Sequence, residues 1–217
     1  MPPHPTAQPP APRTARKRQA ILEAATQVFL SEGFAGASMD AVAAAAGVSK
    51  PTVYNHFADK QQLFEQIVRD MIEGIARPFY DQLLSLGETR DLENSLCGIA
   101  YDLLAAVMQP PNLQLRRLVI GESSRFPELG HAYEKQGPGR AVSALTDAIA
   151  RLAEQGTLRV DDPCLAAAQL NWLIVSVPLN HAMLTGTDRS PGRATLRGYA
   201  DSAVRLFLAG YGTSARP

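Results

Sequence analysis

The chain has 217 residues, of which 46% are hydrophobic, and its formal net charge is zero. This length allows one large or two small domains with a buried core, and the absence of a long apolar run excludes a membrane-spanning chain. The zero net charge excludes a protein that is basic throughout. It hides an asymmetry, because residues 13–60 carry six Lys and Arg against four acidic residues, which is weakly typical of a DNA-binding module.

Residues 1–12 are rich in Pro and lack any helical period, so we expect a disordered arm there. The N-terminus also lacks the apolar core of a signal peptide, which predicts a cytoplasmic protein. Four basic residues follow at the start of the first helix: Arg13, Arg16, Lys17 and Arg18. They are either a solvated helix start or an electrostatic arm that lies near phosphates, and both interpretations stay open.

The first helix is expected to run to about Glu32. Its buried stripe has helical spacing and consists of Ile21, Leu22, Ala25, Val28 and Phe29. Gly33 is expected to stop it.

The segment from Ser38 to Phe57 predicts two short helices joined by a tight turn. Ser38 is a good N-cap for the first of them, and Gly47 suits the left-handed conformation that follows a helix end. Ser49 is placed to cap the second helix, with Pro51 in its first turn, where the missing N–H is no loss.

The second short helix is expected to bury Val53 and Phe57, which lie one turn apart. This leaves polar side chains pointing outward: Lys50, Thr52, Tyr54, Asn55 and His56. Lys50 lies at the N-terminal end, where recognition helices contact base edges, and the other side chains suit phosphate oxygens. Lys60, just beyond, adds a charge for the DNA backbone. By itself this pattern is also typical of a helical hairpin with a solvated face.

The N-terminal segment resembles the DNA-binding domain of the TetR/AcrR family of transcriptional regulators. The resemblance rests on ILEAATQVFLSEGF at 21–34, then Ser38-Met39, then AVAAAAGVSKPTVYNHFADKQQLF at 41–64. It implies that residues at these positions face DNA: Ser38, Lys50, Pro51, Thr52, Tyr54, Asn55, His56 and Lys60. Ser38 and Pro51 depart from the family's more usual Thr and Gly, and the second departure bears on which bases are read.

The rest of the chain keeps a helical period. Asp59 is expected to cap a long helix to Leu84, which Pro78 should kink or break. Since no stretch alternates with period two, the predicted fold is all-α with about nine helices. We expect a helix-turn-helix DNA-binding domain at 15–75 and a regulatory, ligand-binding and dimerisation domain at 76–217.

The last two helices carry much apolar surface, which predicts a homodimer interface with two-fold symmetry. The resemblance to the family agrees with this. The residues assigned to the interface are Leu173, Val177, Leu196, Tyr199, Ala203 and Phe207.

The family resemblance also implies a small-molecule cavity in the C-terminal domain. The candidate ligand-binding residues are Tyr101, Met108, Arg117, Phe126, Asn171 and Trp172, with Tyr80, Tyr133 and His181 as further candidates. Asn171 and Trp172 stand out on an otherwise apolar helix, since a buried Asn needs a partner. Nothing in the sequence identifies the ligand.

The sequence predicts no catalytic residues, no metal site, no cofactor and no membrane partner. The four His are scattered, and Cys97 and Cys164 are too far apart for a zinc knuckle or a disulfide framework. Ser123 and Ser124 beside Glu122 are better explained as helix surface than as a nucleophile. We therefore expect a repressor that a small-molecule effector releases from a palindromic double-stranded operator; the alternatives are a helical ligand-binding protein with an inactive head, and a regulator that activates.

Overall fold

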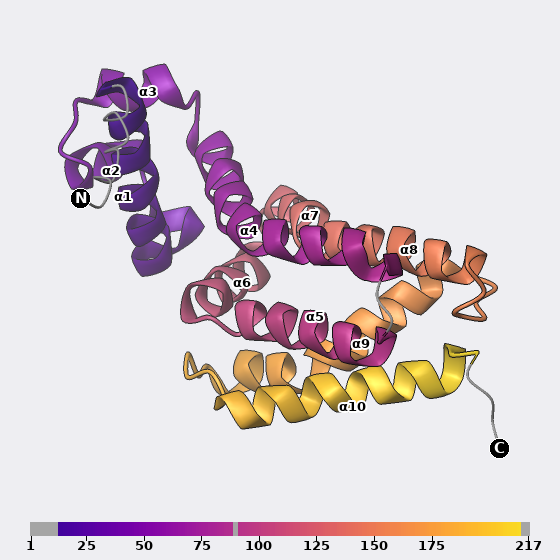
Figure 1. Ribbon diagram of the computed structural model, residues 1–217. Coiled ribbons are helices and arrows are strands. Elements are labelled where there is room, and N and C mark those ends of the chain that lie inside the picture. Colours follow the sequence, from indigo (N-terminus) through magenta and orange to yellow (C-terminus); the bar gives the residue numbers. More distant parts are fainter. Residues whose placement is uncertain (1–12, 89–90, 214–217) are drawn as a thin grey trace, which may run out of the picture. The chain divides into compact units, whose positions relative to one another are not determined.

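The computed structural model describes residues 13–88 and 91–213 and is almost wholly helical in these ranges (Figure 1). It contains ten α-helices, a short 3₁₀ helix and no strand in the described residues, apart from one isolated bridge between Leu158 and Gly212. The all-α prediction is confirmed, with one helix more than the nine expected. The arm predicted at residues 1–12 lies outside the described residues.

The chain divides into two compact units, which meet between Ile67 and Val68. The first unit holds α1 (Arg13–Gly36), α2 (Met39–Ala45), α3 (Lys50–His56) and the start of α4 (Lys60–Ser85). The second unit holds the rest of α4, the 3₁₀ helix η1 (Leu86–Glu88) and six further helices. These are α5 (Leu92–Val107), α6 (Pro110–Glu122), α7 (Pro127–Gln136), α8 (Pro138–Glu154), α9 (Pro163–Thr185) and α10 (Arg193–Tyr211).

An aromatic cluster lies at the centre of the first unit. The rings of Phe29, Phe34 and Phe64 are all buried, with centroids 5.5–5.7 Å apart. Gly33 lies between two of these residues in the sequence and has φ +73°, which ends the regular part of α1 as expected. A positive φ at this point costs glycine little, and it allows Phe34 to reach the cluster.

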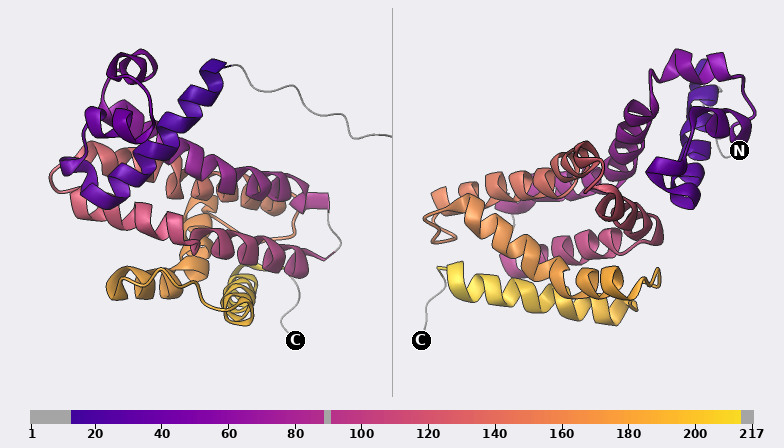
Figure 2. Two further views of the ribbon diagram at one scale, coloured as in Figure 1. Left: turned by 90° about the vertical axis from the view of Figure 1, so that its left-hand side faces the viewer. Right: turned by 180° about the vertical axis from the view of Figure 1, so that it is seen from behind.

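The second unit is built around apolar faces of α5, α8, α9 and α10. In Figures 1 and 2, α10 lies along α5, and these two helices are in extensive contact. Proline begins α6, α7, α8 and α9, where its missing N–H costs no hydrogen bond. Asp91 and Asp162 cap α5 and α9 through their carboxylates, which each accept from a backbone N–H at 3.0 Å. Proline and capping residues thus place most of the helix starts in this unit.

Of the kink or break expected at Pro78, the break does not occur, since α4 continues through Pro78 to Ser85. Its N-terminus is well capped: the Asp59 carboxylate accepts from the N–H of Gln62 at 2.7 Å, and the Gln62 side chain accepts from the N–H of Ala58 at 2.7 Å. This reciprocal pair satisfies two helix-end donors and confirms Asp59 as the cap.

The predicted interface on α10 needs correction. Leu196, Ala203 and Phe207 are only 2–4% exposed in the single chain, because their face of α10 packs inward on α5. They are core residues and are not available to a partner subunit. Tyr199 is half-buried, whereas Leu173 and Val177 on α9 are 41% and 57% exposed.

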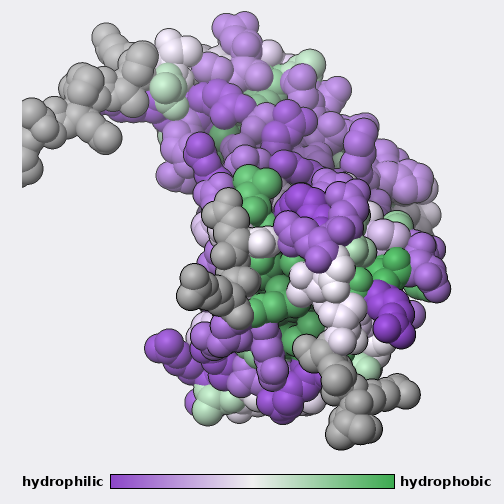
Figure 3. Space-filling view, turned by 45° about the vertical axis from the view of Figure 1, so that its right-hand side comes forward, coloured by the Kyte–Doolittle hydropathy of each residue, from purple (hydrophilic) through white to green (hydrophobic). Residues whose placement is uncertain are grey.

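Hydrophilic residues cover most of the surface seen in Figure 3, and hydrophobic residues gather in one area of it. Across residues 13–88 and 91–213, no helix combines the length and apolar character needed to cross a membrane.

Candidate DNA-binding surface and ligand cavity

The α2–α3 hairpin is held by local hydrogen bonds. The Ser38 hydroxyl accepts from the N–H of Ala41 at 3.1 Å, which confirms it as the N-cap of α2. In the turn, the N–H of Val48 donates to the carbonyl of Ala43 at 3.1 Å, and Gly47 has φ +64°. A left-handed residue at this position is the usual end of a helix and costs glycine little.

Helix α3 has a buried face and an exposed face. Val53 and Phe57 are 0% and 3% exposed, so they hold α3 against the first unit. The opposite face carries the residues predicted for DNA: Lys50, Pro51, Tyr54 and Asn55 are exposed, and Thr52 and His56 are partly exposed. The structure brings all six together on one short helix, beside the exposed Ser38 at the start of α2.

Lys50 is positioned by contacts within the hairpin. Its ammonium lies 2.8 Å from the carboxylate of Asp40, and this hydrogen-bonded partner raises the pKa of Lys50. The ring of Tyr54 lies 6.0 Å from the same ammonium. Thr52 is restrained as well, because its hydroxyl and that of Ser49 are 2.7 Å apart. The N-terminal end of α3 is therefore a charged and partly preorganised surface.

Lys60 differs from the sequence-based prediction. Its ammonium donates to the carbonyl oxygens of Phe34 at 2.6 Å and Ala37 at 2.9 Å, with a longer contact to Ala35 at 3.4 Å. It also lies 4.6 Å from the ring centroid of Phe34. An ammonium has three donors, and all three point into the protein. We therefore assign Lys60 to tying the start of α4 to the end of α1, in place of a phosphate contact.

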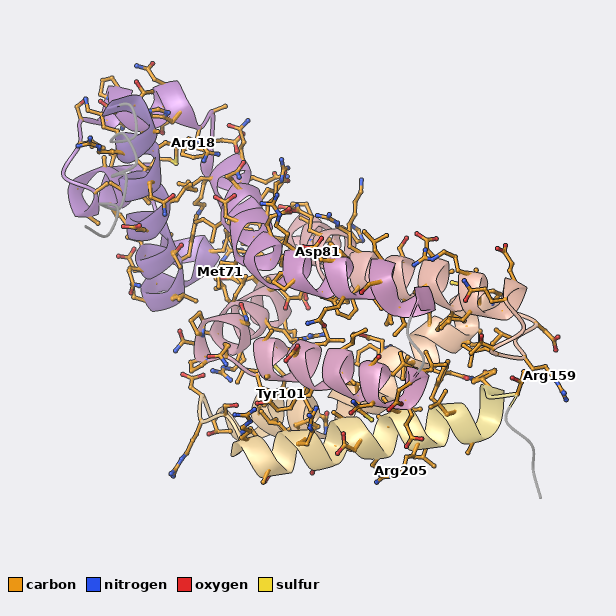
Figure 4. All side chains as sticks on the ribbon, in the orientation of Figure 1. Arg18, Met71, Asp81, Tyr101, Arg159 and Arg205 are labelled. Carbon is orange, nitrogen blue, oxygen red and sulfur yellow. The ribbon has the colours of Figure 1, made fainter. Side chains whose placement is uncertain are left out.

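The basic residues at the start of α1 also separate into two kinds. The guanidinium of Arg18 lies 5.4 Å from the ring centroid of Phe57 and is partly buried, so it packs against the end of α3 (Figure 4). Lys17 is exposed. Arg18 thus fits neither of the two interpretations left open by the sequence, a solvated helix start or an arm near phosphates, because it packs on the protein. The exposed Lys17 is compatible with both.

The second unit contains a cavity of about 90 Å³, which is several times the space that one water molecule needs. Helices α4 to α9 all contribute to its wall. The lining residues are Ile72, Phe79, Tyr80, Leu103, Val107, Asn112, Leu115, Arg116, Tyr133, Gly137, Pro138, Ala141, Asn171, Trp172 and Val175. Four residues considered from the sequence are among them: Tyr80, Tyr133, Asn171 and Trp172.

Asn171 is the most informative residue of the cavity. It is 6% exposed and is the one buried polar or charged side chain found in the described residues. Its amide takes part in none of the hydrogen bonds found within residues 13–88 and 91–213. The neighbouring Trp172 is 50% exposed, so it lines the cavity at its boundary with the surface.

Arg116 and Tyr133 form a pair in the cavity wall. The guanidinium lies 5.7 Å from the centroid of the tyrosine ring. Burial raises the pKa of Tyr133, and the nearby Arg116 opposes this shift only in part. Tyr133 is therefore a neutral phenol that keeps its hydroxyl proton at physiological pH.

The other predicted ligand-binding residues do not line this cavity. Arg117 forms an ion pair with Asp188 and donates to the carbonyl of Thr187 at 3.4 Å, so it fastens the loop after α9. Met108 is 1% exposed and belongs to the core. Tyr101 lies on α5 under the guanidinium groups of Arg193 and Arg197 (Figure 4). Phe126 precedes α7 and packs with Arg125. None of these four residues lines this cavity.

Arg116 and Arg117 illustrate why the prediction missed part of the cavity. Both are arginines on α6, but successive residues on a helix point about 100° apart, and only Arg116 faces the cavity. The apolar lining residues carried no signal that separates them from ordinary core. In the part of the chain that the structure describes, no cluster of His, Cys, Asp or Glu is suited to a metal ion.

Comparison with known proteins decides the family. Residues 21–67 match the model of bacterial regulatory proteins of the tetR family, and residues 94–213 match the AefR-like transcriptional repressor C-terminal domain. The second match alone covers more than half of the chain. The chain belongs to the TetR family.

Solved structures of TetR-family proteins agree over nearly the whole chain. A protein from Mesorhizobium loti assigned to this family is 36% identical, with a TM-score of 0.84, over 93% of this chain and 100% of that one. The flavonoid-responsive regulator FrrA is 29% identical, with a TM-score of 0.76, over the same shares of the two chains.

The regulator SrpR of Pseudomonas putida is 25% identical over 66% of this chain, which spans 64% of the length of SrpR. The activator FasR of Mycolicibacterium smegmatis is 38% identical and is spanned over 42% of its length. TetR-family regulators bind DNA and ligands and act as dimers. The two family matches fall on the α2–α3 hairpin and on most of the cavity wall.

Proposed function

We propose that this chain is a sequence-specific DNA-binding transcriptional regulator, which represses from a palindromic operator and is released by a small molecule. The observation that carries the proposal is the α2–α3 hairpin, whose buried Val53 and Phe57 leave a polar face of α3 exposed. It is supported by the names of the curated relatives, which are transcriptional regulators. A protein with this role acts on DNA in the cytoplasm.

The exposed face of α3 supplies the proposed DNA contacts. Lys50, at the N-terminal end of the helix, reaches guanine N7 and O6 when it exchanges Asp40 for a base. Thr52 offers a hydroxyl and a methyl group to a neighbouring base, and Pro51 shapes the approach. The polar groups of Ser38, Tyr54, Asn55 and His56 donate to phosphate oxygens and fix the register.

The proposed dimer uses the exposed face of α9. Large apolar side chains recur there at helical spacing and are 41–80% exposed: Leu165, Trp172, Leu173, Val177 and Leu184. Exposure of these apolar side chains to water is unfavourable. In a dimer with two-fold symmetry, the α9 faces of the two subunits would cover each other. In the dimer, the two α3 helices would contact major-groove faces about 34–36 Å apart. The partly exposed Tyr199 on α10 stays at the edge of this surface.

The cavity is the proposed effector site. Its unpartnered Asn171 and the aromatic side chains around it support a small-molecule ligand. A response of FrrA to flavonoids, as its name states, supports ligand control in this chain as well. Helix α4 contributes Ile72 and Phe79 to the cavity, while Lys60 at its start is tied to α1. Ligand that shifts α4 would therefore alter the hairpin and lower the affinity for DNA.

Selection of bound sequences from a random DNA pool, at near-physiological salt, tests the proposal. We expect recovery of one palindromic motif, because a two-fold dimer binds two equal half-sites. Recovery of no motif from folded dimer, with and without candidate ligands, would favour a ligand-binding protein with an inactive head. A motif whose reporter gene is switched on by the protein would retain DNA binding and replace repression by activation.

A further inference from the structure

The side-chain amide of Asn171 has no hydrogen-bonding partner among the described residues. A buried amide offers two N–H donors and one carbonyl acceptor, and buried polar groups are nearly always hydrogen-bonded. Asn171 is 94% buried as a residue and lines the cavity, and its amide bonds to no other described group. Its nitrogen and oxygen are not among the enclosed polar atoms that lack a partner, so they open onto the cavity and bond to whatever fills it, water or ligand. A ligand group that does so must accept from the N–H₂ and donate to the carbonyl oxygen.

The rest of the wall selects a flat, apolar body for the ligand. Aromatic rings contribute from three helices: Phe79 and Tyr80 from α4, Tyr133 from α7 and Trp172 from α9. Aliphatic side chains such as Leu103 and Val175 fill the space between them. Aromatic side chains favour stacked or edge-on contact with another ring. A planar aromatic ligand packs against these side chains better than a flexible aliphatic chain does.

The charges of the residues that line the cavity restrict the charge that the ligand can carry. Among the described residues that line the cavity there is no carboxylate, and Arg116 is the one cation. A cationic ligand would lose its hydration beside a like charge, which is unfavourable. An anionic ligand would have acceptors only, so it would face the Asn171 carbonyl oxygen without a proton to donate. A neutral hydroxyl on an aromatic ring satisfies both halves of the amide.

We propose that the effector is a neutral, flat aromatic compound whose phenolic hydroxyl donates to Oδ1 and accepts from Nδ2 of Asn171. The inference rests on the proposed use of this cavity as the effector site. In this arrangement Trp172 and Phe79 contact the ring, and Arg116 with Tyr133 closes the polar side of the cavity. The hydroxyl takes the place of the hydrogen-bonding partner that Asn171 lacks.

The only tryptophan of the chain is Trp172, which lies both in the cavity wall and on the exposed α9 face, so the titration is run where sedimentation velocity shows that subunit association does not change. Protein labelled with 5-fluorotryptophan gives one ¹⁹F resonance, which can be followed during titration with small probes, of which p-cresol and p-xylene are matched in size. The probes are p-cresol, 4-methylanisole, p-xylene, 4-methylbenzoate and 4-methylbenzylamine. They share the methylated ring and differ in carrying a hydroxyl, a methyl ether, a methyl group, an anion or a cation.

We expect p-cresol to bind most tightly. Loss of the hydroxyl proton in 4-methylanisole, or of the oxygen in p-xylene, should weaken binding about fivefold to tenfold, as one hydrogen bond is worth. The cation and the anion should bind more weakly still. Equal affinity for p-cresol and p-xylene, tighter binding of either ion, or no saturable shift with p-cresol would overturn the inference.

Variants of Asn171 assign the preference to this amide. Asn171→Leu keeps the number and branching of the non-hydrogen side-chain atoms, removes the polar groups, and should bind p-cresol and p-xylene equally. Asn171→Asp should gain affinity for 4-methylbenzylamine, because it places a carboxylate in the cavity, and should still accept the hydroxyl proton of p-cresol. Asn94→Leu on α5 makes the same substitution at an exposed position outside the cavity and should keep the preference of the unmodified protein. A leucine variant with the unmodified preference, and a melting temperature that shows it is folded, would refute the role of Asn171.

A parallel measurement separates this inference from the proposed function. Fluorescence anisotropy of the selected operator reports DNA binding, whereas the ¹⁹F shift at constant subunit association reports ligand binding at the cavity wall. If p-cresol binds with the expected preference and leaves operator binding unchanged, the ligand chemistry stands and effector release fails. If the operator is bound and the probes show no preference for the hydroxyl, the ligand chemistry fails and DNA recognition stands.

Discussion

At the scale of single residues, the two lysines of the first unit have different partners. Lys50 is held by one exposed ion pair with Asp40, whereas the ammonium of Lys60 is enclosed by backbone carbonyls of Phe34 and Ala37. An exposed ion pair contributes little to stability and exchanges readily for another anion or a base. A partly buried ammonium that donates to several carbonyl groups at a helix end exchanges its partners less readily. The same residue type therefore serves recognition at one position and folding at the other.

Replacement of Lys60 tests its structural role. Lys60→Met should lower the free energy of unfolding by about 1–3 kcal/mol, because it leaves helix-end carbonyls without their charged donor. Urea denaturation measures this loss, and Lys17→Met, at an exposed position of α1, should leave stability unchanged. We also expect the slope of log affinity for DNA against log salt to stay the same. A slope reduced by about one unit, with normal stability, would return Lys60 to the phosphate contacts.

Replacement of Lys50 tests base recognition. Lys50→Ala should relax the preference at one position of each half-site, where the discrimination lost is about 1–3 kcal/mol for a good base contact. Repeating the DNA selection with the variant measures this directly. Lys135→Ala, at an exposed position in the second unit, is the matched control and should return the original motif. If both variants select the same sequence, Lys50 contacts no base.

At the scale of elements, the hairpin depends on one backbone conformation. Gly47 has φ +64° between α2 and α3, and a Cβ built there meets no atom within 4 Å. A Cβ atom at position 47 would therefore meet no steric clash, and the left-handed backbone conformation is what favours glycine there. This turn sets the direction in which α3 leaves α2.

Gly47→Ala should destabilise the chain by about 1–2 kcal/mol, since a residue with a Cβ pays this cost in the left-handed region. Gly121→Ala is the matched control: it lies within α6, also has no atom near its Cβ, and should stabilise by roughly 0.5–1 kcal/mol. Thermal unfolding of both variants measures the difference. An alanine at 47 that costs nothing would show that the turn relaxes to another conformation.

At the scale of the whole molecule, dimerisation depends on which apolar face each terminal helix leaves exposed. The apolar stripe of α10 packs inward on α5, so only α9 offers a row of large exposed apolar side chains. Trp172 belongs both to that face and to the cavity. Subunit association and ligand binding thus share a residue.

Val177→Asp should convert the dimer to a monomer, because it places a charge in the centre of the proposed apolar face. Sedimentation velocity measures the change, and affinity for the full palindrome should fall with it. Leu84→Asp is the control: Leu84 is 69% exposed on α4, outside the α9 face, and should stay dimeric. A Val177→Asp protein that remains dimeric would move the interface elsewhere.

Local signals predicted the first unit well. Ser38, Gly47, Pro51 and Asp59 mark helix ends by hydrogen-bonding and backbone properties that depend on near neighbours in the sequence. Helical period also indicated the inward position of Val53 and Phe57. The errors concern side chains whose partners lie far away, as Lys60 shows, with carbonyls 23 and 26 residues distant. No local pattern encodes such a contact.

By itself, the sequence determined the all-helical class, the hairpin with its exposed polar face, and the pairing of Asn171 with Trp172 on an apolar helix, because all of these follow from period and from capping chemistry. Only the tertiary structure decided that Arg116 and not Arg117 lines the cavity, and that the apolar stripe of α10 is buried while α9 leaves a row of large apolar side chains exposed. The reason is physical. A period defines an apolar face but not which neighbour covers it, and that depends on how several helices pack together.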